Sequence, residues 1–420
     1  MDGWPEGRVH DSVATVNVVQ APEWKRQLVS SRLIKTLPIE GANYFTPIAF
    51  ARDGRTLLGY SERGGASLDI EGGRFSINVP WPSEPRAYQV KLSPKQSTYY
   101  VARMGTRTEQ VVKDGITTPY HHQIGGLEAY DVATGAKLQL FEGREPSSVY
   151  GVSVSPDENW LGFCEVGSGS AGPNDAAWRT VLLDLRSNRE TIVESCFSIP
   201  IFTPEMSHVF LADYNRSKGS STLYRLDFPE LNSTILEAED NTAIVSPDIS
   251  SDGRWMIRRR QPLDDSQPME VELWNRASEQ VVWKAKHSIN SVTYAIFSPD
   301  SRRVALVDCG SGVRFFDLET QAETMAFAPP TATVELWDPK FSPDGTKFAL
   351  IASGLNNDSP RSTDPEDYDQ PALWLADMTD PTNPEQVTLP PGRAWLFVWT
   401  PDGKAVAIRS TAGYWIVNCS

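Results

Sequence analysis

A short turn motif recurs eight times along this chain of 420 residues and limits its fold more than any other feature. The clearest copy is FSPDG, and the other copies read FARDG, LSPKQ, VSPDE, FTPEM, ISSDG, FSPDS and WTPDG. The residues at the Asp position are Asp53, Lys95, Asp157, Glu205, Asp252, Asp300, Asp344 and Asp402. Their spacing runs from 42 residues (53 to 95) to 62 residues (95 to 157), which indicates eight units of roughly four short strands each.

Apolar residues alternate before each turn, as Ala295 and Phe297 do, and this period of two predicts a strand. A second apolar run in each unit ends in a short acceptor side chain suited to a tight turn, namely Asp69, Asp131, Asp184, Asp227, Asn275, Asp317, Asp377 and Asn418. Each unit is therefore expected to contain strands A to D, with the motif between A and B. In the sixth unit we expect them at 293–297, 303–309, 313–317 and 323–328.

The eighth unit stops after its strand C and lacks a strand D. The segment from Arg32 to Leu37 resembles the other D strands, so we expect it to complete the last unit and close a ring. The sequence thus predicts an all-β, eight-bladed β-propeller of four-stranded antiparallel blades. The predicted organisation is an N-terminal arm over 1–23 and one propeller over 24–420, with units starting near 42, 87, 149, 197, 243, 292, 335 and 394.

These units resemble the WD-like repeats of Tol-translocation, tricorn-type and prolyl-oligopeptidase-type propellers, which carry FSPDG before strand B and an Asp that closes strand C. The resemblance covers about Arg32 to Ser420. It implies the fold, but it implies no particular activity, because propellers carry many unrelated functions. Hydrolases with such propellers add a peptidase domain with a G-x-S-x-G motif, which this sequence lacks.

Composition narrows the function classes. The net charge of -15 and the pI near 4.9 argue against a nucleic-acid partner, which would require clustered Lys and Arg. The sequence shows neither a signal peptide nor a long apolar span, so we expect no membrane partner and a cytoplasmic location, with a processed mature chain as the alternative. The four cysteines lie far apart and are expected to be free thiols.

The two faces of such a disc differ. The A–B and C–D turns lie on one face, which we call the turn face. The B–C and D–A connections lie on the other, which we call the insertion face. The longest connections belong to the insertion face, with 106–126 in the second unit and 355–371 in the seventh as the largest. Long connections in a compact repeat favour a binding face, although solvated loops without a function are the alternative.

Four aromatic residues near the start of strand A are candidate binding residues at the channel mouth: Tyr88, Tyr150, Trp337 and Trp395. The alternative is packing between blades, because they share the alternation of the core positions. Further candidates in the insertions are Tyr120, His121, His122, Trp178, Asp364, Asp367 and Asp369. No third ligand accompanies the His pair, and the acidic run does not match a calcium loop, so neither a metal nor a cofactor is expected.

The leading hypothesis is a non-catalytic scaffold that binds a protein or peptide through the insertion face and channel mouth. We expect a basic partner, because an acidic surface attracts positive charge. The alternative is an enzyme or small-ligand binder with its site at the channel mouth, although no catalytic residue can be assigned. A third possibility is a component of a larger assembly that docks through its first 20 or so residues.

Overall fold

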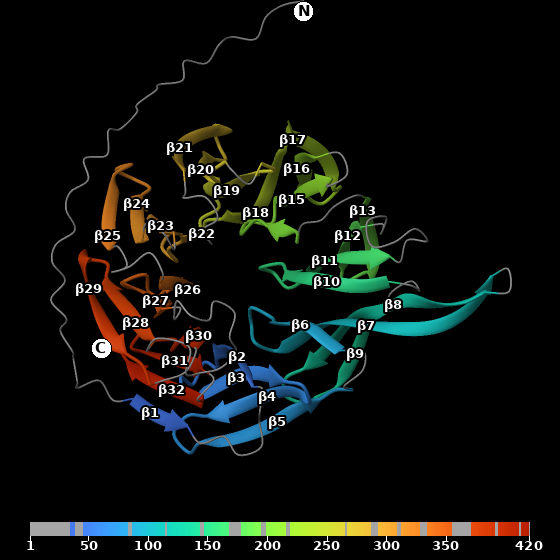
Figure 1. The fold of residues 1–420 in the computed structure, drawn as a ribbon, viewed down its shortest axis with the longest axis horizontal. Coiled ribbons are helices and arrows are strands. Elements are labelled where there is room, and N and C mark those ends of the chain that lie inside the picture. Colours follow the sequence, from blue (N-terminus) through green and yellow to red (C-terminus); the bar gives the residue numbers. More distant parts are fainter. Residues whose placement is uncertain are drawn as a thin grey trace, which may run out of the picture.

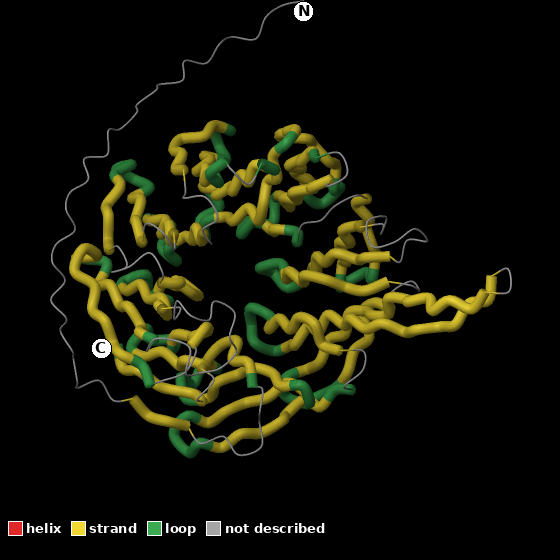
Figure 2. Tube along the Cα trace, viewed as in Figure 1, coloured by secondary structure: helices red, strands yellow, loops and turns green. Residues whose placement is uncertain are grey.

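The computed structural model describes residues 34–37, 45–82, 86–113, 116–142, 147–167, 178–194, 199–215, 219–264, 267–286, 293–308, 312–327, 334–354, 371–390, 394–410 and 413–419. These residues form 32 strands in eight four-stranded sheets. They contain no helix, and the tube view shows strands joined by short loops (Figure 2). The sheets stand around a central opening as eight blades, with strand A of each blade innermost (Figure 1). The predicted eight-bladed propeller is confirmed.

The blades are numbered in chain order. The strands of blades 1 to 4 are β2 (Thr46–Phe50), β3 (Thr56–Ser61), β4 (Gly64–Asp69), β5 (Arg74–Pro80), β6 (Arg86–Leu92), β7 (Thr98–Lys113), β8 (Ile116–Asp131), β9 (Lys137–Glu142), β10 (Ser147–Val154), β11 (Trp160–Gly167), β12 (Trp178–Asp184), β13 (Arg189–Glu194), β14 (Ile201–Phe202), β15 (His208–Asn215), β16 (Ser220–Asp227) and β17 (Asn232–Asp240).

The strands of blades 5 to 8 are β18 (Thr242–Ile249), β19 (Trp255–Pro262), β20 (Glu270–Asn275), β21 (Gln280–Lys286), β22 (Thr293–Phe297), β23 (Arg303–Asp308), β24 (Gly312–Asp317), β25 (Glu323–Phe327), β26 (Val334–Phe341), β27 (Lys347–Gly354), β28 (Ala372–Asp377), β29 (Asp380–Thr388), β30 (Ala394–Trp399), β31 (Ala405–Ser410) and β32 (Gly413–Asn418), with β1 (Ile34–Leu37) completing blade 8.

The two ends of the chain close the ring. Strand β1 pairs antiparallel with β32, from Ile34 opposite Val417 to Leu37 opposite Tyr414. The hydroxyl of Tyr414 also donates a hydrogen bond to the carbonyl of Phe45, which joins blade 8 to blade 1. The predicted closing strand at the N-terminal side is therefore confirmed, and the last blade has the same four strands as the others.

The apolar core is divided among the junctions between blades. The described residues form eight hydrophobic clusters, and each cluster combines residues from two adjacent blades. Between blades 4 and 5, for example, Phe210 and Leu223 pack with Ile244 and Met256. Each large apolar side chain buried in this way contributes about 1.5–3 kcal/mol, so blades are stabilised mainly by their neighbours.

The recurring turn is held by a buried hydroxyl. In blade 7 the Oγ of Ser342 donates to Asp344 at 2.6 Å and accepts the backbone N–H of Lys347 at 2.9 Å. Ser155, Ser250, Ser298 and Thr400 make the same pair of bonds in their blades. Each of these hydroxyl residues is buried. The motif recurs because it satisfies backbone groups that a tight turn would otherwise leave unpaired.

The residue after the motif's Asp position has a left-handed backbone conformation in every blade, and in blades 2, 3 and 6 its side chain bonds to the preceding turn. It has a positive φ of 56° to 72° in all eight blades, at Gly54, Gln96, Glu158, Met206, Gly253, Ser301, Gly345 and Gly403. In blade 2, Nε2 of Gln96 donates to the carbonyl of Phe50 in blade 1 at 2.8 Å. In blade 6, Oγ of Ser301 accepts the N–H of Asp252 in blade 5 at 3.0 Å. The turn face is therefore a structural seam between blades.

Strand A departs from the predicted continuous alternation. Its pairing with strand B shifts register in six blades, within β2, β6, β10, β18, β26 and β30. The shifted segments contain Pro247 in β18 and Pro339 in β26, which cannot donate to the ladder, and Gly151 in β10, whose φ is 55°. Such β-bulges redirect side chains, and here they lie on the strands that border the channel.

The connection at 106–126 is a strand hairpin, whereas the sequence reading treated it as a long loop. Strands β7 and β8 pair without interruption from Thr98 opposite Asp131 to Lys113 opposite Ile116. The hairpin projects beyond the perimeter of the ring (Figure 1). We refer to its outer part, from Gly105 to Ile124, as the arm. Residues that favour strands flank an Asp-Gly dipeptide at 114–115, a common two-residue hairpin signal that explains the regular structure.

Candidate functional site

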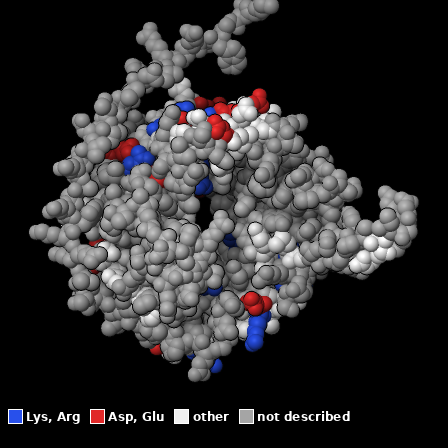
Figure 3. Space-filling view, viewed as in Figure 1, with Lys and Arg blue, Asp and Glu red and all other residues white. Residues whose placement is uncertain are grey.

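The insertion face carries the starts of the A strands and the ends of the B strands. Because each blade is antiparallel, the D–A and B–C connections emerge on the same side. The space-filling view shows that the centre of the ring is open (Figure 3). The A strands therefore present their first residues at one mouth of this opening, beside the root of the arm.

Two large apolar side chains are exposed at this mouth. Tyr88 in β6 is 51% exposed, and Ile199, just before β14, is 42% exposed. Ile199 lies against the backbone of Gly151 in the intervening blade, where an added Cβ would lie 2.3 Å from Cγ1 of Ile199. Two exposed apolar side chains at the channel mouth, on blades 2 and 4, are the kind of feature that recognises a partner. The sequence reading selected Tyr88 but did not single out Ile199.

Two other predicted aromatics are partly buried. Trp337 packs against the cluster between blades 7 and 8. The guanidinium of Arg409 lies over the ring of Trp395, 5.1 Å from its centroid. Both residues lie near register shifts of strand A.

The remaining predicted residues are only partly covered by the structure. The backbones of Tyr120, His121 and His122 lie in β8 of the arm, where His122 pairs with Arg107 and His121 with Thr108. The His pair is thus in a strand, and its expected position in a loop is wrong. Tyr150 lies in β10 and Trp178 begins β12. The side chains of these five residues, and the whole of Asp364, Asp367 and Asp369, lie outside the described part of the chain.

Polar contacts join neighbouring A strands along the channel. Oδ2 of Asp338 accepts the N–H of Phe397 at 2.8 Å and a bond from Nζ of Lys340 at 2.7 Å. Burial raises the pKa of Asp338, and the ammonium of Lys340 opposes that rise. In blade 2, Oε1 of Gln89 accepts the N–H of Val152 in the same way at 2.6 Å. These side chains connect adjacent blades and therefore have a structural role.

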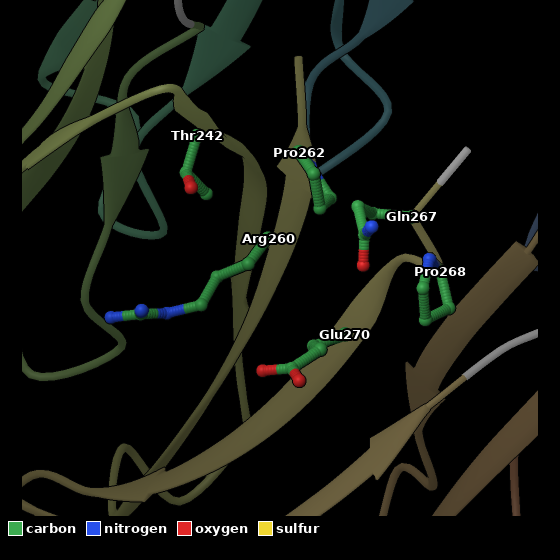
Figure 4. Close-up of a pocket in the computed structure, with 6 residues that line it drawn as sticks. All are labelled: Thr242, Arg260, Pro262, Gln267, Pro268 and Glu270. Carbon is green, nitrogen blue, oxygen red and sulfur yellow. The ribbon is translucent and has the colours of Figure 1, made fainter. Parts of the chain in front are cut away.

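A small pocket opens on the insertion face of blade 5. It has a volume of about 150 Å³ and is lined by Thr242, Arg260, Pro262, Gln267, Pro268 and Glu270. Its walls come from the start of β18, the end of β19 and the start of β20, together with the connection between β19 and β20 (Figure 4). That connection is the PLDDSQPM insertion of the fifth unit.

The pocket adjoins an ion-pair network between blades 4 and 5. The two arginines Arg258 and Arg260 pair with Glu272 at 2.8 and 2.9 Å, and Lys284 pairs with it at 2.5 Å. Both arginines also pair with Glu237 on β17, and Arg260 pairs with Glu239. Two of the three consecutive arginines at 258–260 are therefore paired with glutamates at the junction of blades 4 and 5. The sequence does not reveal this ion-pair network, because its members come from two blades.

A Ser-His-Asp arrangement occurs at the turn face of blade 4. Oγ of Ser207 lies 2.6 Å from Nδ1 of His208, and Nε2 of His208 lies 3.4 Å from Asp227. Arg276, which can only donate, lies 3.2 Å from Nδ1, so Nδ1 accepts and Nε2 carries the proton. The hydroxyl of Ser207 has one proton for two acceptors, Nδ1 of His208 and the carboxylate of Glu205 at 2.7 Å. The bond to Glu205 matches that of Thr346 to Asp344 at the same turn position in blade 7, so the turn itself accounts for the placement of Ser207.

Other chemical features are limited within the described residues. Among them, no group of three or more His, Cys, Asp or Glu side chains is placed to hold a metal ion. Cys164 and Cys419 are buried free thiols, as expected. The described part of the chain contains no long apolar helix of the kind that spans a membrane.

Comparison with known proteins supports the fold. No protein-family model and no curated protein sequence matches the chain. The C-terminal WD40 domain of Sif2 aligns with 92% of this chain and 98% of its own, at 11% identity and a TM-score of 0.58. The chain has the fold of the WD-like β-propellers. An oligogalacturonate lyase from Vibrio parahaemolyticus aligns with 93% of this propeller and 94% of its own chain, at 11% identity and a TM-score of 0.50.

A structure from a study of two prolyl endopeptidases aligns with 78% of this propeller at 13% identity and a TM-score of 0.52. The aligned region spans 49% of that chain. A WD40 domain, a lyase and a peptidase thus share the propeller fold. The fold therefore does not identify the function of this chain.

Proposed function

We propose that this propeller is a non-catalytic recognition scaffold that binds a protein or peptide partner through the insertion face and the channel mouth. The main support for the proposal is the length of the arm. Nine residue pairs, from Gly105 opposite Ile124 to Lys113 opposite Ile116, continue beyond the pairing with β6 and β9. An isolated two-stranded ribbon is only marginally stable in water, so a ribbon of this length gains most from a partner that covers it.

The exposed side chains at the channel mouth also favour the insertion face as the binding surface. Tyr88 in β6 and Ile199 just before β14 lie at the starts of two A strands, and both would lose contact with water on binding. Buried apolar and aromatic anchors supply most of the free energy of a protein interface. The net charge of -15 favours a basic partner, because it accelerates encounters with positive charge.

The test is affinity capture with the intact chain, followed by titration of the captured partner against purified variants. Tyr88→Ser, Ile199→Ser and a chain in which a two-residue turn replaces 106–124 should each weaken binding at least about tenfold, as loss of an interface anchor does. Native β-sheet content and an unchanged unfolding midpoint would confirm that each variant is folded.

The matched controls are Leu138→Ser in β9 and Ile235→Ser in β17, which are 59% and 62% exposed on outer strands. They remove similar apolar surface from the perimeter and should leave the affinity within about twofold. Equal affinity for all five variants and the parent chain would refute the proposal.

A further inference from the structure

The arm has two long edges along which no described strand pairs. On one side, the pairing of β7 with β6 ends at Met104 opposite Arg86, whereas β7 continues to the tip of the arm. On the other side, the pairing of β8 with β9 ends at Gly126 opposite Glu142. Each edge therefore presents a row of backbone N–H and C=O groups that the described strands leave to solvent or to a partner.

The strand register determines which residues point out from each edge. The carbonyl of Thr98 accepts the N–H of Ser93 at 2.9 Å, so the backbone groups of Thr98 point away from β8. Asp131, opposite Thr98, donates its N–H to Ala136 at 3.0 Å and so points away from β7. This direction alternates with each residue, and the β7–β8 register runs to the tip without a shift. The outward residues in the arm are therefore Thr106, Thr108, Gln110 and Val112 on β7, and Thr117, Pro119, His121 and Gln123 on β8.

The two edges differ in their ability to accept another strand. Pro119 has no N–H, and it occupies an outward position in the middle of the β8 edge. Proline on an edge strand is a common protection against strand addition. The β7 edge contains no proline, so each of its four outward residues offers both an N–H and a C=O. The arm is thus protected on one edge and open on the other.

The open edge indicates the chemistry of its occupant. It continues the row of β7 backbone groups to which β6 is already bonded, so an extended backbone in line with β6 matches it. Antiparallel pairing, as in β6, is the more stable arrangement. The net charge of -15 on each copy disfavours a second copy of this chain and favours a basic segment of another protein.

We propose that an extended, proline-free segment of the basic partner adds to the outer edge of β7 along residues 106–112, as a strand antiparallel to β7. The inference rests on the proposed function and deepens it, because it states how the arm recognises the partner. Main-chain hydrogen bonds supply affinity in this mode of recognition, and side-chain contacts elsewhere, such as those of Tyr88 and Ile199, add specificity.

The test uses the full chain and two synthetic probes, followed by fluorescence anisotropy. The first is an acetylated, amidated octapeptide of alternating valine and lysine. The second is the same peptide with its fourth and fifth residues N-methylated, which blocks both edges of its backbone and keeps its charge. We expect the first peptide to bind at least about tenfold more tightly, because only it can extend the sheet. Equal affinities, or no measurable binding of either peptide, would overturn the inference.

Proline substitutions locate the strand addition. Gln110→Pro and Val112→Pro each remove an outward N–H from the β7 edge without removing a bond between β7 and β8, and each should weaken the first peptide at least about tenfold. Thr117→Pro, directly opposite Val112, removes an outward N–H from the β8 edge and should change the affinity by less than about twofold. Native β-sheet content and an unchanged unfolding midpoint would confirm that the variants are folded. Equal effects of Val112→Pro and Thr117→Pro would show that the β7 edge is not the site.

Light scattering on the chain alone tests the other occupant of this edge. We expect a monomer, because two copies repel each other. A dimer that Val112→Pro dissociates, with Thr117→Pro still dimeric, would identify a second copy as the occupant and overturn the inference.

The edge and the proposed function fail separately in the titration of the captured partner. If Gln110→Pro and Val112→Pro keep the partner but the Tyr88 and Ile199 variants lose it, the edge assignment is wrong and the proposed function stands. If the peptide binds at the β7 edge but the Tyr88 and Ile199 variants keep the partner, the edge stands and recognition through the channel mouth is wrong.

Discussion

At the scale of single residues, the repeated motif is explained by hydrogen bonding. The buried hydroxyl of the Ser or Thr joins the carboxylate of the turn to the first backbone N–H of strand B, and the carboxylate accepts a further N–H, as Asp344 does from Thr346 at 3.0 Å. These bonds lower the pKa of Asp344, with the Ser342 bond as the largest contribution. The motif is therefore evidence for the fold, and it carries no information about a ligand.

The first prediction concerns the buried hydroxyl of Ser342. Ser342→Ala leaves the N–H of Lys347 without its side-chain acceptor and should lower the free energy of unfolding by about 1–3 kcal/mol. Thr346→Ala, whose exposed hydroxyl bonds to the same Asp344, is the matched control and should cost about 1 kcal/mol or less. Urea unfolding followed by fluorescence measures both, and equal midpoints for the two variants would contradict the hydroxyl's role.

At the scale of elements, contacts between neighbouring blades combine apolar clusters with charged groups. The junction of blades 4 and 5 is the clearest case, because His208 of β15 lies among Asp227, Glu205, Arg225 and Arg276. Burial lowers the pKa of His208, and the two guanidinium groups lower it further, whereas the two carboxylates oppose the shift. The folded chain therefore holds this imidazole in its neutral form.

The second prediction concerns the pH dependence of that junction. Because the pKa of His208 is lower in the folded chain than its ordinary value of 6.5, the unfolded chain binds the proton more readily. This group's contribution to stability is therefore present above 6.5 and is lost as the pH falls below it. His208→Gln should remove that dependence, so the difference in unfolding free energy between parent and variant should change between about pH 7.5 and 5.

Urea unfolding at several pH values measures this difference. His121→Gln, at a position in the arm, is the control and should follow the parent chain. A difference between the parent and His208→Gln that stays constant across the range would show that His208 titrates alike in the folded and unfolded chains.

Individual strands were largely predictable from the sequence because each unit has local signals. In blade 6 the expected ranges differ from β22, β23, β24 and β25 by no more than one residue at each end. The arm was mistaken for a loop because its strands exceed the length of a blade, although the Asp-Gly dipeptide at 114–115 carried the signal. The bulges of strand A were missed because they depend on pairing, which alternation alone does not reveal.

The candidate site was less predictable, and the reason is physical. Tyr88 could be selected as an aromatic at the start of strand A, but its exposure depends on the neighbouring blades. The pocket requires Thr242, Arg260 and Glu270 to meet from three strands, and Arg260 also pairs with Glu237 and Glu239 of another blade. Such combinations arise from tertiary packing and leave no fixed spacing in the sequence.

At the scale of the whole molecule, the ring depends on β1. Without that strand, β32 would be an open edge of blade 8. The third prediction is that deletion of residues 1–37 lowers the unfolding temperature by several degrees and promotes association through the open edge, whereas deletion of residues 1–23 does neither. Thermal unfolding with light scattering measures both effects, and indistinguishable deletions would mean that the pairing of β1 with β32 contributes little.

The most direct test of the central claim is the hydrogen-exchange footprint of a captured partner on the full chain. The account predicts slower exchange at the arm and at the start of β6, with unchanged exchange at the eight A–B turns. Protection confined to the A–B and C–D turns, with the arm and the channel mouth unaffected, would contradict recognition through the insertion face.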